Sequence, residues 1–293
     1  MKKQIIYSLL ALTTVCLGAC NNNDEIDTAN SIFSTEPLER NAFDYWLLDN
    51  YTYPYNIDFM YRMKDIESDH KYNLVPADYD KAVALSKIIK HVWMDAYVEL
   101  AGMDFLRVYV PKTFHLIGSP AYESSGNMVL GTAEGGKKIT LYNVNDLNIK
   151  KINIEKLNEY YFETMHHEFA HILHQTKDYP IEYNEITVGK YTGPSWTNLT
   201  EEEALELGFI SNYASTEPQE DFVEMIANYV THNAQWWRER MDMAGDGKEA
   251  LQQKLELVKE YLDLSWNISL DELRTIVQRR SAEISSLDLS SLK

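Results

Sequence analysis

Residues 161–174 of this 293-residue chain are YFETMHHEFAHILH, and they hold four of its eight histidines. Within them, His167 and His171 flank Glu168 in the pattern HExxH. Residues four apart share one face of a helix, so both imidazoles can reach one ion. Glu168 is rotated by about 100° from His167, which keeps its carboxylate off the metal but near a water bound to it. The spacing therefore predicts a zinc site on a helix.

An apolar stripe would bury the opposite side of this helix; it consists of Phe162, Met165, Phe169 and Ile172. Two alternatives remain open from the motif alone. The histidines could be a pair on a solvated helix face, or they could hold a metal that only stabilises the fold.

A catalytic zinc site needs a third protein ligand and one open position. Metzincin-like enzymes place a third histidine at the tenth position after the first, but that position is Lys177, and His174 lies on the same helix as the other two. Gluzincin-like enzymes instead take a glutamate from a later helix. Glu220 and Glu224 are one helical turn apart, and such carboxylates repel unless a cation or a histidine N–H compensates them. We therefore expect the third ligand here; the alternative is one more acidic helix in an acidic protein.

The remaining chain predicts an α+β fold, in which a helix and a small β-sheet are followed mainly by helices. A helix is expected at 80–100, where apolar residues form one stripe and Gly102 follows. Residues 44–63 are aromatic-rich without a clean period, and we expect a short helix with irregular packing. A capping box at 200–203 and a first-turn proline at 218 mark two later helix starts. The later helices are expected at 154–176, 200–207, 218–233, 248–264 and 270–284.

The sheet is expected between these helical regions. Strands are predicted at 106–110 and 114–117, where β-branched and aromatic residues predominate. A hairpin is predicted over 128–144, with its turn at Gly135–Gly136. Within it, residues Thr140–Tyr142 are expected to form an edge strand against which an extended peptide could pair, although a strand without any ligand is an equal alternative.

The first twenty residues predict a lipoprotein signal. Lys2 and Lys3 precede an apolar stretch that is too short to span a bilayer, and residues 17–20 (LGAC) resemble the lipobox of bacterial lipoproteins. The chain would be cut before Cys20 and acylated there; the alternative is an ordinary secretory signal that contains a cysteine. The expected domains are a signal peptide at 1–19, a lipidated polar tether at 20–37, and a zincin-like catalytic domain at 38–293. That domain would comprise a helix and sheet part at 38–150 and a helical part with the metal site at 151–293.

The composition narrows the classes of function. A formal net charge of −18 argues against a nucleic-acid binder, because phosphate backbones attract basic surfaces. The hydrophobic share of 45% is enough for a sizeable core. Both cysteines, Cys16 and Cys20, fall in the first twenty residues, so residues 21–293 can form neither a disulfide nor a thiolate metal site.

Together these features resemble the zinc-dependent HExxH lipoproteins found beside nutrient-import systems of Bacteroidota, the substrate-import-associated zinc metallohydrolases. The resemblance is carried by residues 55–57, by the hairpin before the active helix, and by residues 167–175, 208–214 and 220–224. It implies a zinc metallopeptidase with one zinc ion, a peptide or glycopeptide substrate, and a TonB-dependent import system as partner. It also implies a cell-envelope lipoprotein held at the outer membrane by the lipid on Cys20.

Two of these segments also resemble the catalytic domain of anthrax lethal factor. There a tyrosine precedes the ligand glutamate by seven residues, and a second glutamate follows it by four; Tyr213, Glu220 and Glu224 keep those intervals. The resemblance implies that Glu220 is the third zinc ligand, that Tyr213 faces the substrate, and that Glu224 orients a ligand histidine. His174 departs from this relative. We expect it to support a ligand or to contact the substrate, with a plain surface histidine as an equal alternative.

These residues predict a hydrolase of amide bonds. Glu168 would take the proton of an attacking, zinc-activated water and deliver it to the departing amine, while Tyr213 would donate a hydrogen bond to the developing oxyanion. A competing hypothesis is a non-catalytic accessory binder of a glycan or peptide uptake system, with a structural zinc. Its sugar-stacking surface would centre on Trp236–Trp237, although aromatics of a buried core explain most of the aromatic count.

Overall fold

The computed structural model describes residues 39–292, except for 65–67, 123–127, 130 and 135–136. The chain divides into two units, Met1–Arg40 and Asn41–Lys293, and all elements described below belong to the second. The predicted signal peptide, the lipidated Cys20 and the tether lie outside the described residues, and so does the turn at Gly135–Gly136. The domain boundaries therefore stay predictions.

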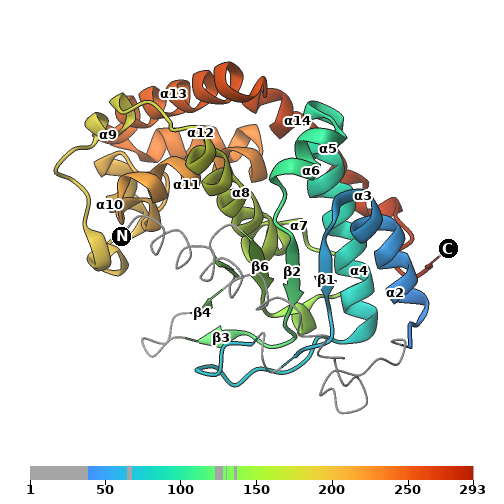
Figure 1. The fold of residues 1–293 in the computed structure, drawn as a ribbon. Helices are drawn as coiled ribbons and strands as arrows, with labels where there is room; N and C mark the ends of the chain where they lie inside the picture. Colours follow the sequence, from blue (N-terminus) through green and yellow to red (C-terminus); the bar gives the residue numbers. More distant parts are fainter. Residues whose placement is uncertain (1–38, 65–67, 123–127, 130, 135–136, 293) are drawn as a thin grey trace, which may run out of the picture. The chain divides into compact units, whose positions relative to one another are not determined.

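A small sheet with the strand order β1-β2-β6-β5 lies among the helices (Figure 1). Its strands are β1 (Asp58–Met60), β2 (Thr113–Leu116), β5 (Gly131–Glu134) and β6 (Lys138–Leu141). β1 pairs with β2 and β2 with β6 in parallel, whereas β5 pairs with β6 in antiparallel fashion. The strand predicted at 114–117 and the pairing within the predicted hairpin are thus confirmed. Two further strands, β3 (Ala121–Tyr122) and β4 (Met128–Val129), form a separate antiparallel pair.

The prediction of an edge strand at Thr140–Tyr142 is wrong. Thr140 pairs with His115 of β2 on one side and with Thr132 of β5 on the other, so β6 lies inside the sheet. Its parallel partner arrives from an earlier part of the chain, and such a non-local pairing leaves no mark on the local sequence pattern. The outer strand on this side is β5.

The helix predicted at 80–100 is confirmed. It consists of α4 (Tyr79–Ile89), a π-helical turn η4 (Lys90–Met94) and α5 (Asp95–Ala101). It ends at Gly102, whose φ of +88° favours glycine. Before it, α2 (Ala42–Leu47), a π-helical turn η2 (Leu48–Thr52) and α3 (Tyr53–Tyr55) form the short helical region expected there. The strand β1 was not expected.

The prediction of a strand at 106–110 is wrong, because these residues belong largely to α6 (Met103–Tyr109). Leu106 and Val110 are buried while Val108 between them is 65% exposed, which is the i, i+4 spacing of a helix and not the alternation of a strand. Strand preference of β-branched residues is weak, and packing of Leu106 into the core overrides it.

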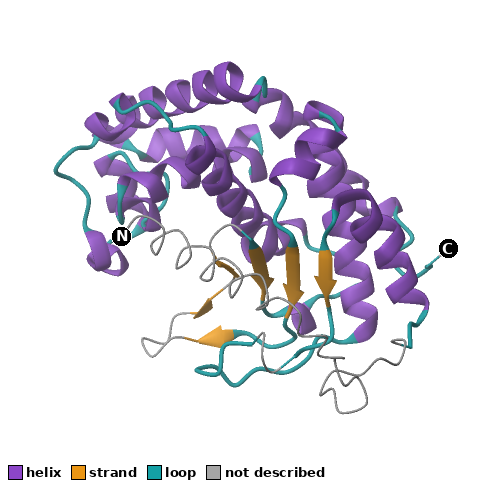
Figure 2. Cartoon of the chain, viewed as in Figure 1, coloured by secondary structure: helices purple, strands orange, loops and turns teal. Residues whose placement is uncertain are grey.

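The chain after residue 150 is helical, as predicted, and most of the structure is helix (Figure 2). Its helices are α7 (Ile154–Leu157), π-helical η6 (Asn158–Phe162), α8 (Glu163–Thr176), α9 (Glu182–Ile186), α10 (Glu201–Leu207), α11 (Pro218–Thr231), α12 (Ala234–Met243), α13 (Lys248–Trp266) and α14 (Leu270–Glu283). Short 3-10 turns lie at Val144–Asp146, Gly193–Asn198, Tyr213–Ser215, Gly245–Gly247 and Ile284–Ser286. The predicted capping box at Thr200 is present, whereas α9 and α12 were not expected. Within the described residues, no helix combines the length and the apolar character needed to cross a bilayer.

Aromatic side chains fix the rotation of α8 against the N-terminal helices. The ring of Phe169 lies 5.3 Å from that of Trp93 and 4.8 Å from that of Tyr97, both edge to face. All three side chains are buried, and such ring pairs add about 0.5–1.5 kcal/mol beyond the burial of apolar area. Because Phe169 is directed into this core, His167 and His171, which lie two residues before and after it, are turned toward α11.

Candidate metal centre

α8 packs against α11, and the two helices bring three predicted ligands together. The Nε2 atom of His167 lies 3.2 Å from the Nε2 atom of His171. The carboxylate oxygens of Glu220 lie 3.0 Å from the first of these nitrogens and 3.4 Å from the second. Two imidazoles and one carboxylate, about fifty residues apart in the sequence, therefore converge on one point.

The start of α11 places Glu220 correctly for this contact. Pro218 occupies the first turn, where its missing N–H costs no hydrogen bond, and Glu217 precedes the helix in extended conformation. Glu220 also lies in the first turn, where the free backbone amides favour a carboxylate. Phe222 and Val223 behind it are fully buried, so the acidic side of the helix is turned toward α8.

The Nδ1 atom of His167 is engaged by Glu224. It lies 2.8 Å from Oε1 of that carboxylate. The other oxygen, Oε2, accepts a hydrogen bond from Ser211 Oγ at 2.6 Å and one from Asn228 Nδ2 at 3.3 Å. A carboxylate can only accept, so the proton of a neutral His167 ring resides on Nδ1 and the Nε2 lone pair is directed at the other donors.

The Nδ1 atom of His171 is engaged by His174, whose Nε2 lies 2.9 Å away. His174 is only 4% exposed, so it is not a surface histidine. Its ring packs edge-on against Tyr179 and Phe222, at 5.5 and 6.3 Å between ring centres. Burial, reinforced by the charge of His171, lowers the pKa of His174 to about 4. A neutral His174 can accept the Nδ1 proton of His171 and thereby leave the Nε2 lone pair of that ring free for a metal.

The three donor atoms fit a zinc ion. Zinc bonds of about 2.0–2.1 Å in tetrahedral geometry place ligand atoms ~3.3 Å apart. The two Nε2 atoms lie 3.2 Å apart, and each has one Glu220 oxygen close to it, Oε2 at 3.0 Å from His167 and Oε1 at 3.4 Å from His171. The Oε2 atom of Glu220 is buried and accepts no well-directed hydrogen bond from the described part of the chain. Lone pairs that face one another in this way repel unless a cation lies between them. Imidazole and carboxylate donors suit zinc.

The electrostatics of the cluster also favour a cation. Burial alone would lower the pKa of His167, but the carboxylates of Glu220 and Glu224 in contact with it raise it to about 10. Burial would raise the pKa of Glu220, yet its contacts with His167 and His171 hold it well below the usual range. A positive charge is thus strongly stabilised where the three side chains meet.

Glu168 and Tyr213 lie beside the cluster without belonging to it. Burial, together with the charges of Glu220 and Glu224, raises the pKa of Glu168 despite the opposing effect of the two histidines. The ring of Tyr213 lies 6.0 Å from that of His167. Burial, the two acidic charges and a hydrogen bond with Glu220 raise the pKa of Tyr213, so its hydroxyl stays protonated.

Three residues near the site were missed by the sequence analysis. Ser211 donates to Glu224; it lies in the segment 208–214 that carries the family resemblance, but no role was predicted for it. Asn228 lies one helical turn after Glu224, and that spacing on one helix face is a signal that could have revealed it. Trp196 packs edge-on against Tyr213, with 5.1 Å between the ring centres, from a loop that the sequence does not connect with the site.

The strand β5 lies directly over α8. A Cβ atom added at Gly131 would meet Cγ2 of Thr164 at 2.5 Å, closer than real Cβ contacts, so only glycine fits here without a shift. Thr164 precedes Glu168 by one helical turn. The outer strand of the sheet therefore runs beside the helix that carries the HExxH motif.

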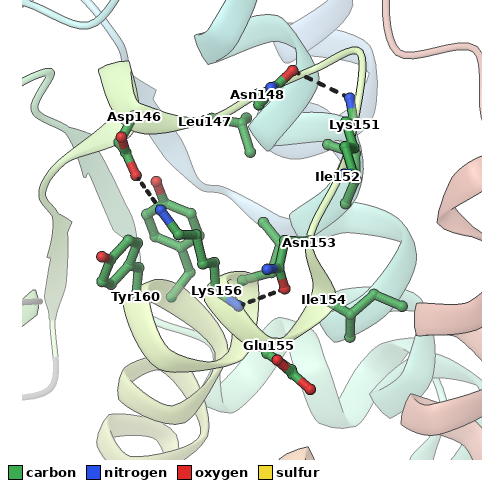
Figure 3. A pocket seen from close by; sticks show the side chains of 12 residues that line it. Asp146, Leu147, Asn148, Lys151, Ile152, Asn153, Ile154, Glu155, Lys156 and Tyr160 are labelled. Atoms are coloured by element: carbon green, nitrogen blue, oxygen red, sulfur yellow. Dashed lines mark hydrogen bonds and ion pairs between the residues drawn. The ribbon is translucent and has the colours of Figure 1, made fainter.

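Two cavities lie in the part of the chain around η6, which leads into α8. One of about 710 Å³ reaches Ser211 and Glu224 and is also lined by Glu163. Burial and the charges of Glu224 and Glu159 raise the pKa of Glu163 to about 8. The other, of about 600 Å³, is lined by the loop before α7, by α7 itself and by two tyrosines of η6, and contains none of the site residues (Figure 3). In it Lys156 pairs with Asp146 at 2.9 Å.

The two neighbouring tryptophans of α12 are engaged within the protein. The ring of Trp236 stacks on His232 with 3.9 Å between the ring centres, and the guanidinium of Arg240 lies 4.7 Å from the centre of Trp236. Trp237 packs edge-on against Tyr229 at 5.1 Å. Both rings thus have packing partners that account for their presence without a sugar ligand.

Comparisons with known proteins agree with a zinc site in this protein. A crystal structure described as a "putative zinc-binding metallo-peptidase" from Bacteroides caccae is 46% identical, with a TM-score of 0.77. The match covers 90% of this chain and 100% of that one. No curated protein matches the chain. A family model described as "Putative zinc-binding metallo-peptidase" matches residues 36–271. The chain therefore belongs to the family described as "Putative zinc-binding metallo-peptidase".

Proposed function

We propose that the protein is a zinc-dependent hydrolase, a metallopeptidase of the gluzincin type that cleaves amide bonds with one zinc ion. His167, His171 and Glu220 would be its protein ligands. One observation carries the proposal: the Nε2 atoms of the two histidines, on one helix, lie 3.2 Å apart, and each lies 3.0–3.4 Å from an oxygen of Glu220 on the packed neighbouring helix. Family membership supports the same class of chemistry.

The chain's own residues account for the proton movements. When bound, zinc supplies Lewis acidity that lowers the pKa of water and polarises a carbonyl group. Glu168 acts as general base, taking a proton from the attacking water and passing it to the departing amine. Tyr213 donates a hydrogen bond to the oxyanion that develops on the carbonyl oxygen. Glu224 and His174 hold the two ligand imidazoles through their Nδ1 atoms.

The substrate class that this arrangement favours is an extended peptide or glycopeptide. β5 is the outer strand of the sheet beside α8, and an outer strand offers backbone donors and acceptors to an added strand. A peptide paired there would pass along the helix turn that contains Thr164 and Glu168. This assigns to β5 the pairing role that the sequence analysis gave to residues 140–142.

The test of the proposal is Glu168→Gln, which removes the base but keeps the size of the side chain. The variant should bind zinc as tightly as the wild type, measured by metal content after dialysis, while hydrolysis of a quenched-fluorescent peptide library falls by at least 100-fold. Glu260→Gln, at an exposed position of α13, serves as control and should keep full activity. Full turnover in Glu168→Gln would remove Glu168 from the mechanism.

The same assay separates an enzyme from an accessory binder. Zinc-dependent turnover that is abolished by a chelator and restored by zinc is the expected result. A zinc-loaded wild type without turnover on peptides or glycopeptides, and with glycan affinity unaffected by the chelator, would favour the binder instead.

We also propose that the protein is a lipoprotein of the cell envelope, anchored at the outer membrane through Cys20 and working beside a TonB-dependent import system. The support is the lipobox-like end of the first twenty residues and the polar stretch at 21–37. Metabolic labelling with an alkyne fatty acid should tag the wild type and leave Cys20→Ser unlabelled. Labelling of the serine variant would contradict the anchor.

A further inference from the structure

Lys254 of α13 is a charged residue without exposed surface, and it lies against the first turn of α11. Its Nζ atom is 2.5 Å from Oδ2 of Asp221, and both side chains are 0% exposed. The same oxygen accepts a hydrogen bond from the Tyr191 hydroxyl at 2.8 Å. The backbone carbonyl of Asp221 accepts another from the Tyr183 hydroxyl at 3.0 Å. Three side chains from outside α11 therefore fix the residue that directly follows Glu220.

The same ammonium group also holds the segment that leads to Ser211 and Tyr213. Lys254 Nζ donates a hydrogen bond to the carbonyl oxygen of Gly208 at 2.8 Å. It also lies 4.3 Å from the centre of the Phe209 ring. Gly208 ends α10 with a φ of +94°, a conformation that favours glycine. Ser211 follows three residues later and Tyr213 five residues later.

Stability alone does not explain a pair of this kind. Both charges lose their hydration on burial, so a buried ion pair is often no more stabilising than neutral groups of similar size, although removal of one partner leaves a costly unpaired charge. What the pair does fix is geometry, since it sets the distance between one atom of α11 and one atom of α13. Asp221 can hardly move unless the adjacent Glu220 moves with it.

We propose that Lys254 is a positioning residue of the metal centre. Through Asp221 it sets the position of Glu220, and through Gly208 it sets the segment that brings Ser211 to Glu224. The inference rests on the proposed function, because it takes Glu220 to be a zinc ligand. None of the three donor atoms comes from α13, so Lys254 acts only through these neighbours.

The experiment compares two variants of the full chain, Lys254→Met and the double variant Lys254→Met/Asp221→Asn. The single variant leaves a buried unpaired carboxylate, whereas the double variant is neutral and keeps an oxygen that can accept the Tyr191 hydroxyl. Zinc affinity is measured by competition with a chromogenic chelator. Thermal unfolding of the metal-free protein is measured separately, and the visible spectrum after cobalt substitution reports the geometry of the ligands.

We expect the single variant to lose both thermal stability and zinc affinity. The double variant should regain much of the stability, while its zinc affinity stays about 10- to 100-fold below that of the wild type and its cobalt spectrum stays altered. Lys259→Met/Asp271→Asn is the matched control, because Lys259 is also on α13 and pairs with Asp271 at 3.1 Å, but at the surface. The control should bind zinc like the wild type.

Wild-type zinc affinity and an unchanged cobalt spectrum in the double variant would overturn the inference. So would a zinc affinity that merely follows the melting temperature through all variants. Failure of the proposed function can be told apart from failure of this inference. A wild type that binds zinc but hydrolyses nothing would contradict the hydrolase function, and the zinc affinities of the variants would still test the role of Lys254.

Discussion

The carboxylate of Glu224 connects Ser211 with His167: Oε2 accepts from the serine hydroxyl at 2.6 Å, and Oε1 lies 2.8 Å from Nδ1 of the histidine. A residue of α11 thus fixes both the rotation of an imidazole on α8 and the start of the segment that carries Tyr213. The contact with Glu224 directs the Nε2 atom of His167 at His171 and Glu220.

Removal of this carboxylate should weaken metal binding. In Glu224→Ala, Nδ1 of His167 loses its acceptor, and the ring is free to turn or to change tautomer. We expect zinc affinity to fall about 10- to 100-fold, as is typical for the partners of ligand histidines. Competition with a chromogenic chelator measures the change, and Glu260→Ala provides the control. An unchanged affinity would mean that Glu224 does not orient the ligand.

Loss of the Tyr213 hydroxyl should slow the chemical step rather than substrate binding. In Tyr213→Phe the ring can keep its packing against Trp196, but the proposed hydrogen bond to the oxyanion cannot form. We expect kcat to fall about 100- to 1000-fold with little change in KM, provided that zinc content is equal. Steady-state kinetics on one peptide substrate test this, with Tyr122→Phe on β3 as the control. Equal kcat values would exclude the assigned role.

A side chain at Gly131 should disturb the contact between β5 and α8. The added Cβ of Gly131→Ala would clash with Cγ2 of Thr164 at 2.5 Å. We expect the variant to lose about 1–3 kcal/mol of unfolding free energy and part of its kcat/KM for extended peptides. Urea unfolding and peptide kinetics provide the two measurements.

A second substitution should relieve the clash between residues 131 and 164. The double variant Gly131→Ala/Thr164→Ala removes the methyl group that the new Cβ meets, and it should recover most of both losses. If the double variant is as impaired as the single one, the distance between β5 and α8 is not set by this contact.

The buried His166 should make stability depend on pH. Its Nδ1 lies 2.9 Å from the Tyr97 hydroxyl, and complete burial lowers its pKa to about 3. The unfolded chain has a histidine pKa of about 6.5, so between pH 6.5 and 3 the unfolded state binds more protons. Stability contributed by the neutral ring is therefore present above pH 6.5 and is lost as the pH falls, by up to about 1.4 kcal/mol per pH unit.

Urea unfolding of the metal-free protein at pH 7 and pH 5 measures this dependence. His166→Gln should be less stable at pH 7 but should lose less on acidification, because it has no proton to bind. Parallel losses in the variant and the wild type would assign the pH dependence to other groups.

Helical periodicity explains why much of this architecture could be predicted. The i, i+4 spacing of His167 and His171, the apolar stripe around Phe169 and the start of α11 at Pro218 are local signals, and each corresponds to a helix with the expected face buried. Local patterns also indicated the pairing of β5 with β6. What these signals have in common is that each depends on residues close together in the sequence.

The wrong predictions concern features that are determined by contacts between distant parts of the chain. β6 lies inside the sheet because β2, about twenty-five residues earlier, pairs with it in parallel. Leu106 belongs to a helix because the core accepts its side chain at i, i+4 spacing from Val110. Similarly, Ser211 and Trp196 approach the site through folding of loops, and no spacing in the sequence links them with the histidines.

The three donor atoms lie on two interior helices, whereas Trp196 and Tyr213 lie in 3-10 turns that connect such helices. Different stretches of backbone therefore carry the candidate metal centre and the aromatic side chains next to it. An exchange of residues 193–198 for another connection should therefore alter which molecules the proposed enzyme accepts, while Tyr191, which holds Asp221 next to Glu220, stays in place.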